Sequence, residues 1–478
     1  MRALLVLVAA AQLASCAGTP AEDPRAAARE PFAWELAPAV AAERPIIDPA
    51  RLHRATLANG LQVVVLEDHR LPRVSAGFIA LRGAAIETPE EAGLAAFTAT
   101  AMERGAGERG ALALAAAIED LGADFDVASD WDTLRAGVSG LSRDSDALFA
   151  VLADVVRRPR FDAADAKRAV AEQRAALAQA KDDPAALAGQ NFARTLYGAH
   201  RLGTPGAGTD ASVARFTPAS ARAFHARVVT PAAAILWAVG DVEAADFLAR
   251  AERDFGDMRG NPPAALPAAP SVPTQRRVVI VDRPDLEQAQ IAIGHEGIAR
   301  TDERRLEVQL LNTAFGSGAF SSRLMARIRA IEGLTYGISA QFAQNRLPGP
   351  FVVSSFTRVP EVGKLLASAF EELERVRTEP PAGEELEAAR QLRIGGYPLA
   401  LETTDAVMAA LLDLDVYGLP RDTLDTYRSR VRAITAEQVA AAARALIHPE
   451  RATIVVVGPA DALREPLSKY GAVEVVEP

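Results

Sequence analysis

The sequence predicts an α+β protein made of two similar domains in tandem. Two strand-like patterns recur along the chain: residues 231–240 and 449–458 each place an apolar run between a proline and a glycine, and the alternating segments 74–79 and 289–294 repeat at nearly the same spacing. Two independent matches at one offset indicate an internal duplication. Between the halves, residues 259–274 are rich in proline and lack any helical or strand period, which is typical of a linker.

The elements of the first half begin with a β-hairpin. Asn59-Gly60 stands between residues 56–57 and the apolar segment 61–66, and this dipeptide is a strong signal for a tight hairpin turn. A strand is expected at 74–81. The apolar periodicity predicts helices at 90–104, 111–121, 144–156, 162–181 and 184–196. Because strands and helices come in runs rather than in strict alternation, we expect antiparallel-rich sheets with helices on one face, in domains spanning 46–258 and 275–478.

Composition narrows the class of protein. The chain has 478 residues, of which 49% are hydrophobic, and this is enough for sizeable cores. Its formal net charge of −10 argues against nucleic acid as a partner, because phosphate binding requires concentrated Lys and Arg.

The N-terminal segment predicts export and lipidation. Met1-Arg2 precede an apolar run at 3–11, which is too short to span a bilayer and is typical of a signal peptide, assigned here to residues 1–15. Leu13-Ala14-Ser15-Cys16 has the residue order of a bacterial lipobox, and Cys16 is the only cysteine. We expect Cys16 to be lipidated, residues 16–45 to form a tether, and the protein to face the periplasm from the outer membrane through its lipid anchor. The alternative is a chance cysteine after an ordinary signal peptide.

A small-residue helix then follows the hairpin and the strand. Its pattern Gly93-Leu94-Ala95-x-Phe97-x-x-x-x-Met102-x-x-Gly105 resembles the pitrilysin/insulinase family of zinc peptidases, the inverzincins. In that family the matching helix carries His-x-x-Glu-His. The resemblance implies that the histidines bind zinc and that the glutamate acts as general base. In this chain the three positions are Ala96, Ala99 and Thr100. The third family ligand, a glutamate on a later helix, falls on Ala176.

None of these four residues can bind zinc, so we expect the site to be lost and the chain to hold no cofactor of its own. A shifted alignment would make Glu172 a ligand. The alternative is that Glu172 lies on a solvated helix face, and one carboxylate cannot hold zinc alone. No two of the six histidines lie three to five residues apart, and His69 and His200 are interpreted as structural.

The second half keeps a different part of the family pattern. A glycine-rich turn from Asn312 to Gly318 leads into a helix that ends at Gly333, and a strand is expected from Thr335. The resemblance implies that Arg329 and Tyr336 form a pair that stabilises the oxyanion of a peptide under attack at a zinc site. The alternative is an arginine at a helix C-terminus and an ordinary strand aromatic.

The resemblance implies that a chain which keeps only this pair is the non-catalytic subunit of a zinc metallopeptidase heterodimer, here expected in the periplasm. The resemblance implies a zinc-bearing partner subunit of the same family, with Arg329 and Tyr336 contributed to the partner's site, and peptides as substrates. A structural or peptide-binding scaffold of the same fold is the main alternative. An autonomous peptidase with an unrelated metal site is a further one.

Overall fold

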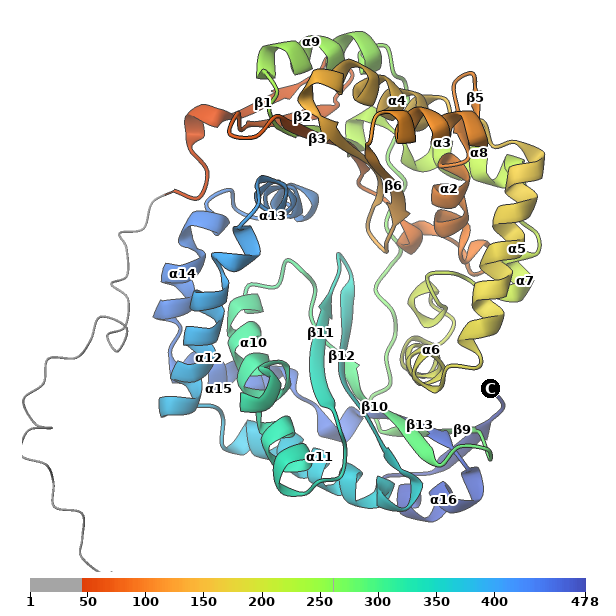
Figure 1. The fold of residues 1–478 in the computed structure, drawn as a ribbon. Helices are drawn as coiled ribbons and strands as arrows, with labels where there is room; N and C mark the ends of the chain where they lie inside the picture. Colours follow the sequence, from red (N-terminus) through yellow and green to blue (C-terminus); the bar gives the residue numbers. More distant parts are fainter. Residues whose placement is uncertain (1–44, 261) are drawn as a thin grey trace, which may run out of the picture. The chain divides into compact units, whose positions relative to one another are not determined.

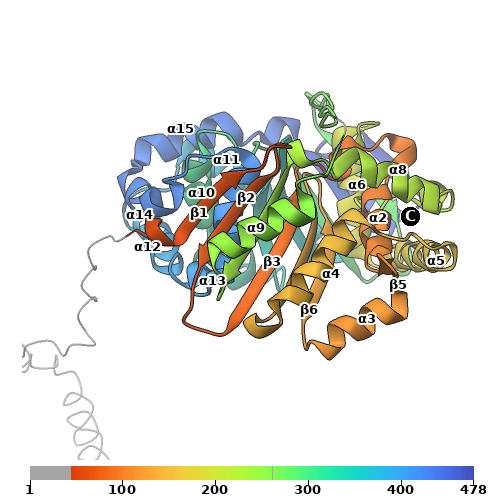
Figure 2. The same ribbon diagram turned by 90° about the horizontal axis from the view of Figure 1, so that it is seen from above.

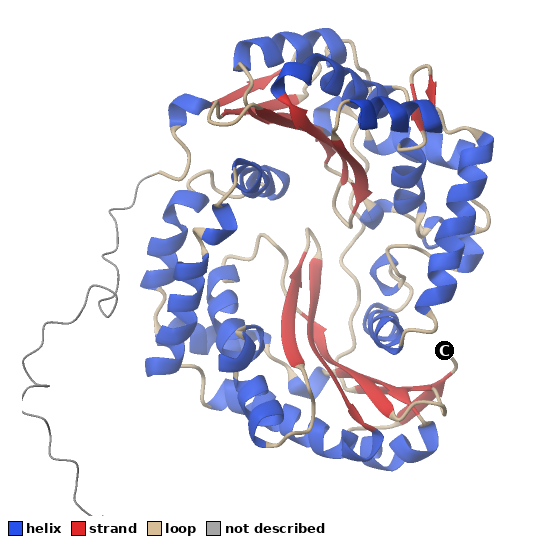
Figure 3. Cartoon of the chain, in the orientation of Figure 1, coloured by secondary structure: helices blue, strands red, loops and turns tan. Residues whose placement is uncertain are grey.

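The structure is a computed structural model that describes residues 45–260 and 262–478, and residues 45–478 form one compact unit. The predicted signal peptide, Cys16 and nearly all of the tether lie outside the described residues. The described chain contains two six-stranded mixed sheets with helices packed on them (Figures 1 and 3).

The first sheet has the strand order β1-β2-β8-β3-β7-β6, in which only β2 and β8 are parallel neighbours. The predicted hairpin is confirmed: β1 and β2 are antiparallel, with Thr56 opposite Gln62, and Gly60 takes the left-handed φ of +91° that the turn requires. Its strands are β1 (Leu52–Thr56), β2 (Gln62–Glu67), β3 (Arg73–Ala80), β6 (Asp124–Ser129), β7 (Leu134–Leu141) and β8 (Ala234–Gly240); β4 (Gly105–Ala106) and β5 (Arg109–Gly110) form a separate small ribbon.

The helices predicted in the first half are present, and the first of them is shorter than predicted. They are α2 (Leu94–Met102), α3 (Ala111–Asp120), α4 (Ser145–Arg157), α5 (Ala163–Ala180), α6 (Pro184–Tyr197), α7 (Asp210–Val213), α8 (Pro218–Val228) and α9 (Ala244–Phe255). The helix predicted at 90–104 starts only at Leu94, because Gly93 has a φ of +92° that breaks helical geometry. Helices α4 and α9 lie across one face of the sheet (Figure 2).

The second sheet has the order β11-β12-β10-β13-β9-β14. Its strands are β9 (Arg277–Asp282), β10 (Gln288–Glu296), β11 (Ile338–Gln344), β12 (Pro348–Arg358), β13 (Thr453–Gly458) and β14 (Val473–Val476). Its half contains α10 (Arg305–Asn312), α11 (Val362–Thr378), α12 (Gly383–Gly396), α13 (Thr404–Tyr417), α14 (Thr423–Ala433), α15 (Ala436–Leu446) and α16 (Ala460–Ser468).

The two sheets repeat one topology, as the predicted duplication requires. Strands β2-β8-β3-β7-β6 correspond in order and direction to β9-β13-β10-β12-β11. The parallel pairs β2/β8 and β9/β13 occupy the same place in the two sheets. The recurring sequence segments fall on β8 and β13, and on β3 and β10. The sixth strands differ: β1 precedes its sheet in the chain and is antiparallel to β2, whereas β14 closes the chain and is parallel to β9.

Each half contributes one helix to the sheet of the other half. Helix α6 packs on β10 and β13 of the second sheet, and α13 packs on β8 of the first. In one cluster Leu187 and Phe192 of α6 meet Val455, and in the other Leu411 of α13 meets Val64. The second face of each sheet is therefore buried by apolar side chains that come from the opposite half of the sequence.

Candidate functional site

The position where the family binds zinc contains no metal ligands in this chain. Helices α2 and α5 pack together. Ala99 of α2 is buried, whereas Ala176 of α5 is exposed. Methyl groups and one threonine hydroxyl cannot provide the three protein ligands of a catalytic zinc site. Within residues 45–260 and 262–478, no group of three His, Cys, Asp or Glu side chains is placed to hold a metal ion. These residues do not fit zinc.

Polar contacts join α2 and α5. The Gln173 amide donates to the backbone carbonyls of Gly93, at 3.0 Å, and Ala207, at 2.8 Å. Glu172 is mostly exposed and forms an ion pair with Arg104. Its carboxylate therefore already has a cationic partner.

A buried ion pair fixes the start of α2. The Glu87 carboxylate accepts hydrogen bonds from the N–H groups of Gly93 (3.1 Å) and Ala95 (2.5 Å), and lies 2.6 Å from an Arg201 nitrogen. The two side chains are 0% and 2% exposed. Burial raises the pKa of Glu87, and the Arg201 charge opposes this shift. The negative charge also stabilises the positive end of the helix dipole, so α2 keeps a defined position although it has lost its chemical groups.

The two histidines interpreted as structural both have protein partners. His69 lies 2.8 Å from Asp241, whose hydrogen bond raises the pKa of the imidazole. His200 accepts from the N–H of Leu202 at 3.2 Å, and its other ring nitrogen lies 3.1 Å from the Ala268 carbonyl.

In the second half, the structure brings Arg329 and Tyr336 into contact. Arg329 lies in a π-helical segment, Met325–Ile331, and its guanidinium carbon is 4.4 Å from the ring centroid of Tyr336 and 4.4 Å from that of Phe320. The guanidinium is therefore held between two aromatic faces. Neither Arg329 nor the Tyr336 hydroxyl has a hydrogen-bond or ion-pair partner in the part of the chain that the structure describes. Single-turn π-helical insertions are frequent at functional sites.

A local turn sets the position of Tyr336. The Thr335 hydroxyl accepts from the Gly337 N–H at 3.0 Å, and the Ser355 hydroxyl donates to the Gly337 carbonyl at 2.9 Å. These bonds bend the backbone, so β11 begins at Ile338 and the predicted strand start at Thr335 is wrong. The bend leaves Tyr336 76% exposed beside Arg329.

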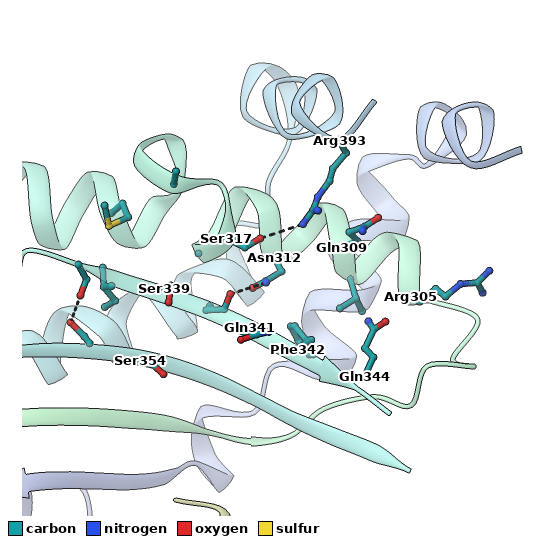
Figure 4. Close-up of a pocket in the computed structure, with 18 of the residues that line it drawn as sticks. Arg305, Gln309, Asn312, Ser317, Ser339, Gln341, Phe342, Gln344, Ser354 and Arg393 are labelled. Carbon is teal, nitrogen blue, oxygen red and sulfur yellow. Dashed lines mark hydrogen bonds between the residues drawn. The ribbon is translucent and has the colours of Figure 1, made fainter. Parts of the chain in front are cut away.

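Arg329 and Tyr336 lie at a cavity of about 970 Å³ that follows the edge strand β11. The lining comes from α10, from a second π-helical segment Thr313–Ser317, from β11 and β12, and from α12 and α14. Its side chains are mainly amides, hydroxyls and arginines, including Gln309, Asn312, Ser317, Ser339, Gln341, Gln344 and Ser354 (Figure 4). This volume lies at the upper end of the range for small-molecule pockets.

Two lining side chains, Arg305 and Arg393, and the neighbouring Phe320 had no signal in the sequence. Phe320 stacks on Arg329 and follows Ala319, whose φ of +51° is unusual for a residue other than glycine. Arg305 and Arg393 enter the cavity from α10 and α12. Burial lowers the pKa of both arginines. No motif marks these three residues, because their proximity to Arg329 depends on how separate helices pack.

Comparisons with known proteins match nearly all of the described chain. A family profile described as insulinase (peptidase family M16) matches residues 62–210, and one described as peptidase M16 inactive domain matches residues 215–393. An uncharacterised zinc protease from Mycobacterium tuberculosis (strain ATCC 25618 / H37Rv) is 30% identical over 86% of this chain and 95% of its own length. An uncharacterised zinc protease from Streptomyces coelicolor is 28% identical over 85% of this chain and 90% of its own.

Solved structures share the fold. A peptidase M16 inactive domain from Pseudomonas fluorescens superposes with a TM-score of 0.80 and 26% identity, covering 85% of this chain and 98% of that one. A protease from Helicobacter pylori superposes with a TM-score of 0.78 and 17% identity, covering 85% and 99%. The chain belongs to the peptidase M16 (pitrilysin/insulinase) family, and its sequence lacks the His-x-x-Glu-His motif.

Proposed function

We propose that this protein is the non-catalytic subunit of a zinc metallopeptidase heterodimer that cleaves peptides in the periplasm. A partner subunit of the same family supplies the zinc and the general base. Arg329 and Tyr336 of this chain stabilise the negative charge that develops on the carbonyl oxygen of the substrate during attack. The second half of this chain also forms part of the peptide-binding chamber.

The observation that carries the proposal is that Arg329 and Tyr336 touch each other, line a cavity, and have no hydrogen-bond or ion-pair partner within the described residues. A guanidinium and a phenol hydroxyl that lie together are suited to an oxyanion. The same chain provides no ligands at the metal position of its first half, so the reacting zinc has to come from another subunit. The main alternative, a scaffold without catalytic involvement, does not require this pair to lie together and unengaged.

The test is peptide cleavage by the chain alone and by the chain reconstituted with a family member that carries His-x-x-Glu-His. The chain alone is expected to be inactive and the pair active. Tyr336→Phe is expected to lower kcat of the pair by about 100-fold with little change in KM, which is the typical cost of removing one oxyanion donor. Tyr470→Phe, which removes a hydroxyl from a half-buried residue outside the cavity, is the matched control.

Two results would contradict the proposal. Unchanged turnover in Tyr336→Phe would favour the scaffold. Chelator-sensitive cleavage by the chain alone would mean that it is an autonomous peptidase.

The same proposal places the protein at the outer membrane through lipid on Cys16. The support is the lipobox-like order around the only cysteine. Within residues 45–260 and 262–478, no helix combines the length and apolarity needed to cross a bilayer. Cys16→Ser is expected to abolish incorporation of labelled palmitate and to move the protein into the aqueous periplasmic fraction. Unchanged labelling and membrane association would refute the anchor.

A further inference from the structure

The cavity along β11 has an unusual charge composition. Its lining includes Arg300, Arg305, Arg329 and Arg393 and contains no Asp, Glu, Lys or His. The chain as a whole has more acidic than basic residues, 62 against 52. The lining thus concentrates positive charge in an otherwise acidic protein.

Three of the four arginines form no ion pair with a carboxylate in the described part of the chain. Arg300 is neutralised by Asp413 at 2.6 Å. Arg329 contacts only aromatic rings among its described neighbours, whereas Arg393 donates to two hydroxyls, those of Thr313 at 2.6 Å and Ser317 at 3.4 Å. These hydroxyls orient the Arg393 guanidinium without cancelling its charge, and Figure 4 shows the contact with Ser317.

Arg305 provides the strongest evidence. The residue is 8% exposed, and one of its terminal guanidinium nitrogens is fully buried without a hydrogen-bond partner in the described chain. Glu307 and Asp413 lie near enough to favour the charge of Arg305, but neither forms an ion pair with it in the described chain. A buried cation without an ion-pair partner is costly, and this protein elsewhere pairs such a cation, as it does Arg201 with Glu87. The unpaired donor therefore indicates that an anion from outside the chain completes the site.

The rest of the lining suits a peptide. Between the arginines lie Gln309, Gln341 and Gln344, whose amides can both donate to and accept from a peptide backbone. In Figure 4, Arg305 and Gln344 lie at one end of the lining, and Ser317 and Ser339 lie toward the other. Positive groups spread along a cavity of about 970 Å³ match carboxylates spaced along a chain better than one compact anion.

We propose that this cavity binds an acidic peptide segment, with Arg305 and Arg393 as the ligands of its carboxylates. The inference rests on the proposed function, because it specifies which peptides that function acts on. The chain then selects substrates rich in Asp and Glu. Arg305 and Arg393 hold the acidic segment in the same cavity that Arg329 and Tyr336 line.

The test is fluorescence anisotropy with the purified full-length chain and two labelled peptides of equal length. One peptide carries four Glu residues, and the other carries Gln at the same positions. The Glu peptide is expected to bind at least tenfold more tightly. Arg305→Gln and Arg393→Gln are each expected to weaken its binding by about tenfold and to leave the Gln peptide unchanged, because each removes one charge-assisted contact. Arg464→Gln, on the exposed face of α16, is the matched control and should have no effect.

Folding is measured separately on the same variants. Removing an unpaired buried charge is expected to leave the melting temperature of Arg305→Gln unchanged or raised. Arg393→Lys, which keeps the charge, should retain the preference for the Glu peptide.

Equal affinity for the two peptides, or arginine variants that bind the Glu peptide normally, would overturn the inference. Inorganic pyrophosphate that binds the cavity more tightly than the Glu peptide would also overturn it and would identify a phosphate site. Because these assays use the chain without its partner, they fail independently of the proposed function. If selectivity is lost but Tyr336→Phe still lowers turnover of the pair, only this inference is wrong.

Discussion

The ion pair beneath α2 provides a quantitative test of how the first half keeps its structure. Arg201→Met removes the only cation that contacts Glu87 among the residues the structure describes, and the Glu87 side chain is fully buried. Breaking a buried pair by deleting one partner typically costs about 3–5 kcal/mol, because a charge stays buried without compensation. Glu87 still accepts two backbone N–H bonds, so we expect a value near the lower end, about 3 kcal/mol.

The assay is native-state hydrogen exchange of the α2 peptide. A loss of about 3 kcal/mol in the free energy of opening corresponds to roughly 150-fold faster exchange. The control is Arg174→Met, which breaks an exposed pair with Asp210 whose side chains are 48% and 57% exposed. Solvent screens that pair, so its loss should speed exchange about fivefold at most.

The double variant Glu87→Gln/Arg201→Met should recover part of the loss, because no charge then stays buried. Exchange of α2 in Arg201→Met within twofold of the Arg174→Met value would refute the reasoning. It would mean that the buried pair does not hold the helix.

Two further predictions concern the pH dependence of stability and helix α13, which packs on the sheet of the other half. Burial lowers the pKa of His295 from 6.5 to about 4. Between these two pH values the unfolded chain binds a proton at His295 and the folded chain does not. The stabilisation present above pH 6.5 is therefore lost as the pH falls toward 4. His295→Gln should remove about 3 kcal/mol of that pH-dependent loss, measured by urea unfolding at pH 7 and pH 4.5, and an unchanged pH slope would contradict this. Leu411→Ala on α13 leaves a cavity against the first sheet and should lower the free energy of unfolding by about 2–5 kcal/mol. The control is Leu392→Ala on α12, where the side chain is 52% exposed and the loss should be less than about 1 kcal/mol. Equal losses would mean that α13 is not needed on that sheet.

Much of the fold could be predicted because its signals are local. The Asn59-Gly60 turn, the repeated strands and the helical periods depend on residues close together in the sequence, and each corresponds to an element of the structure. The exchange of α6 and α13 between the halves could not be predicted. Both helices have apolar faces, but periodicity does not say which sheet buries such a face.

The candidate site shows the same division. The pattern around Gly93 and around Gly333 predicted a lost zinc position and an Arg329/Tyr336 pair, and the structure brings these two residues into contact. The sequence gives no sign that Arg305 lacks a counter-ion, because that depends on which side chains meet after folding. The bend at Thr335 was also missed, since a side-chain hydroxyl there competes with the strand for the backbone N–H of Gly337.

The measurement that bears most directly on the central claim is the zinc content of the purified chain, determined by elemental analysis after dialysis without chelator. We expect far less than one zinc ion per chain, because the sequence pattern aligns Ala96, Ala99, Thr100 and Ala176 with the ligand and base positions of the family. One tightly held zinc ion per chain, bound by the side chains of this protein, would contradict it.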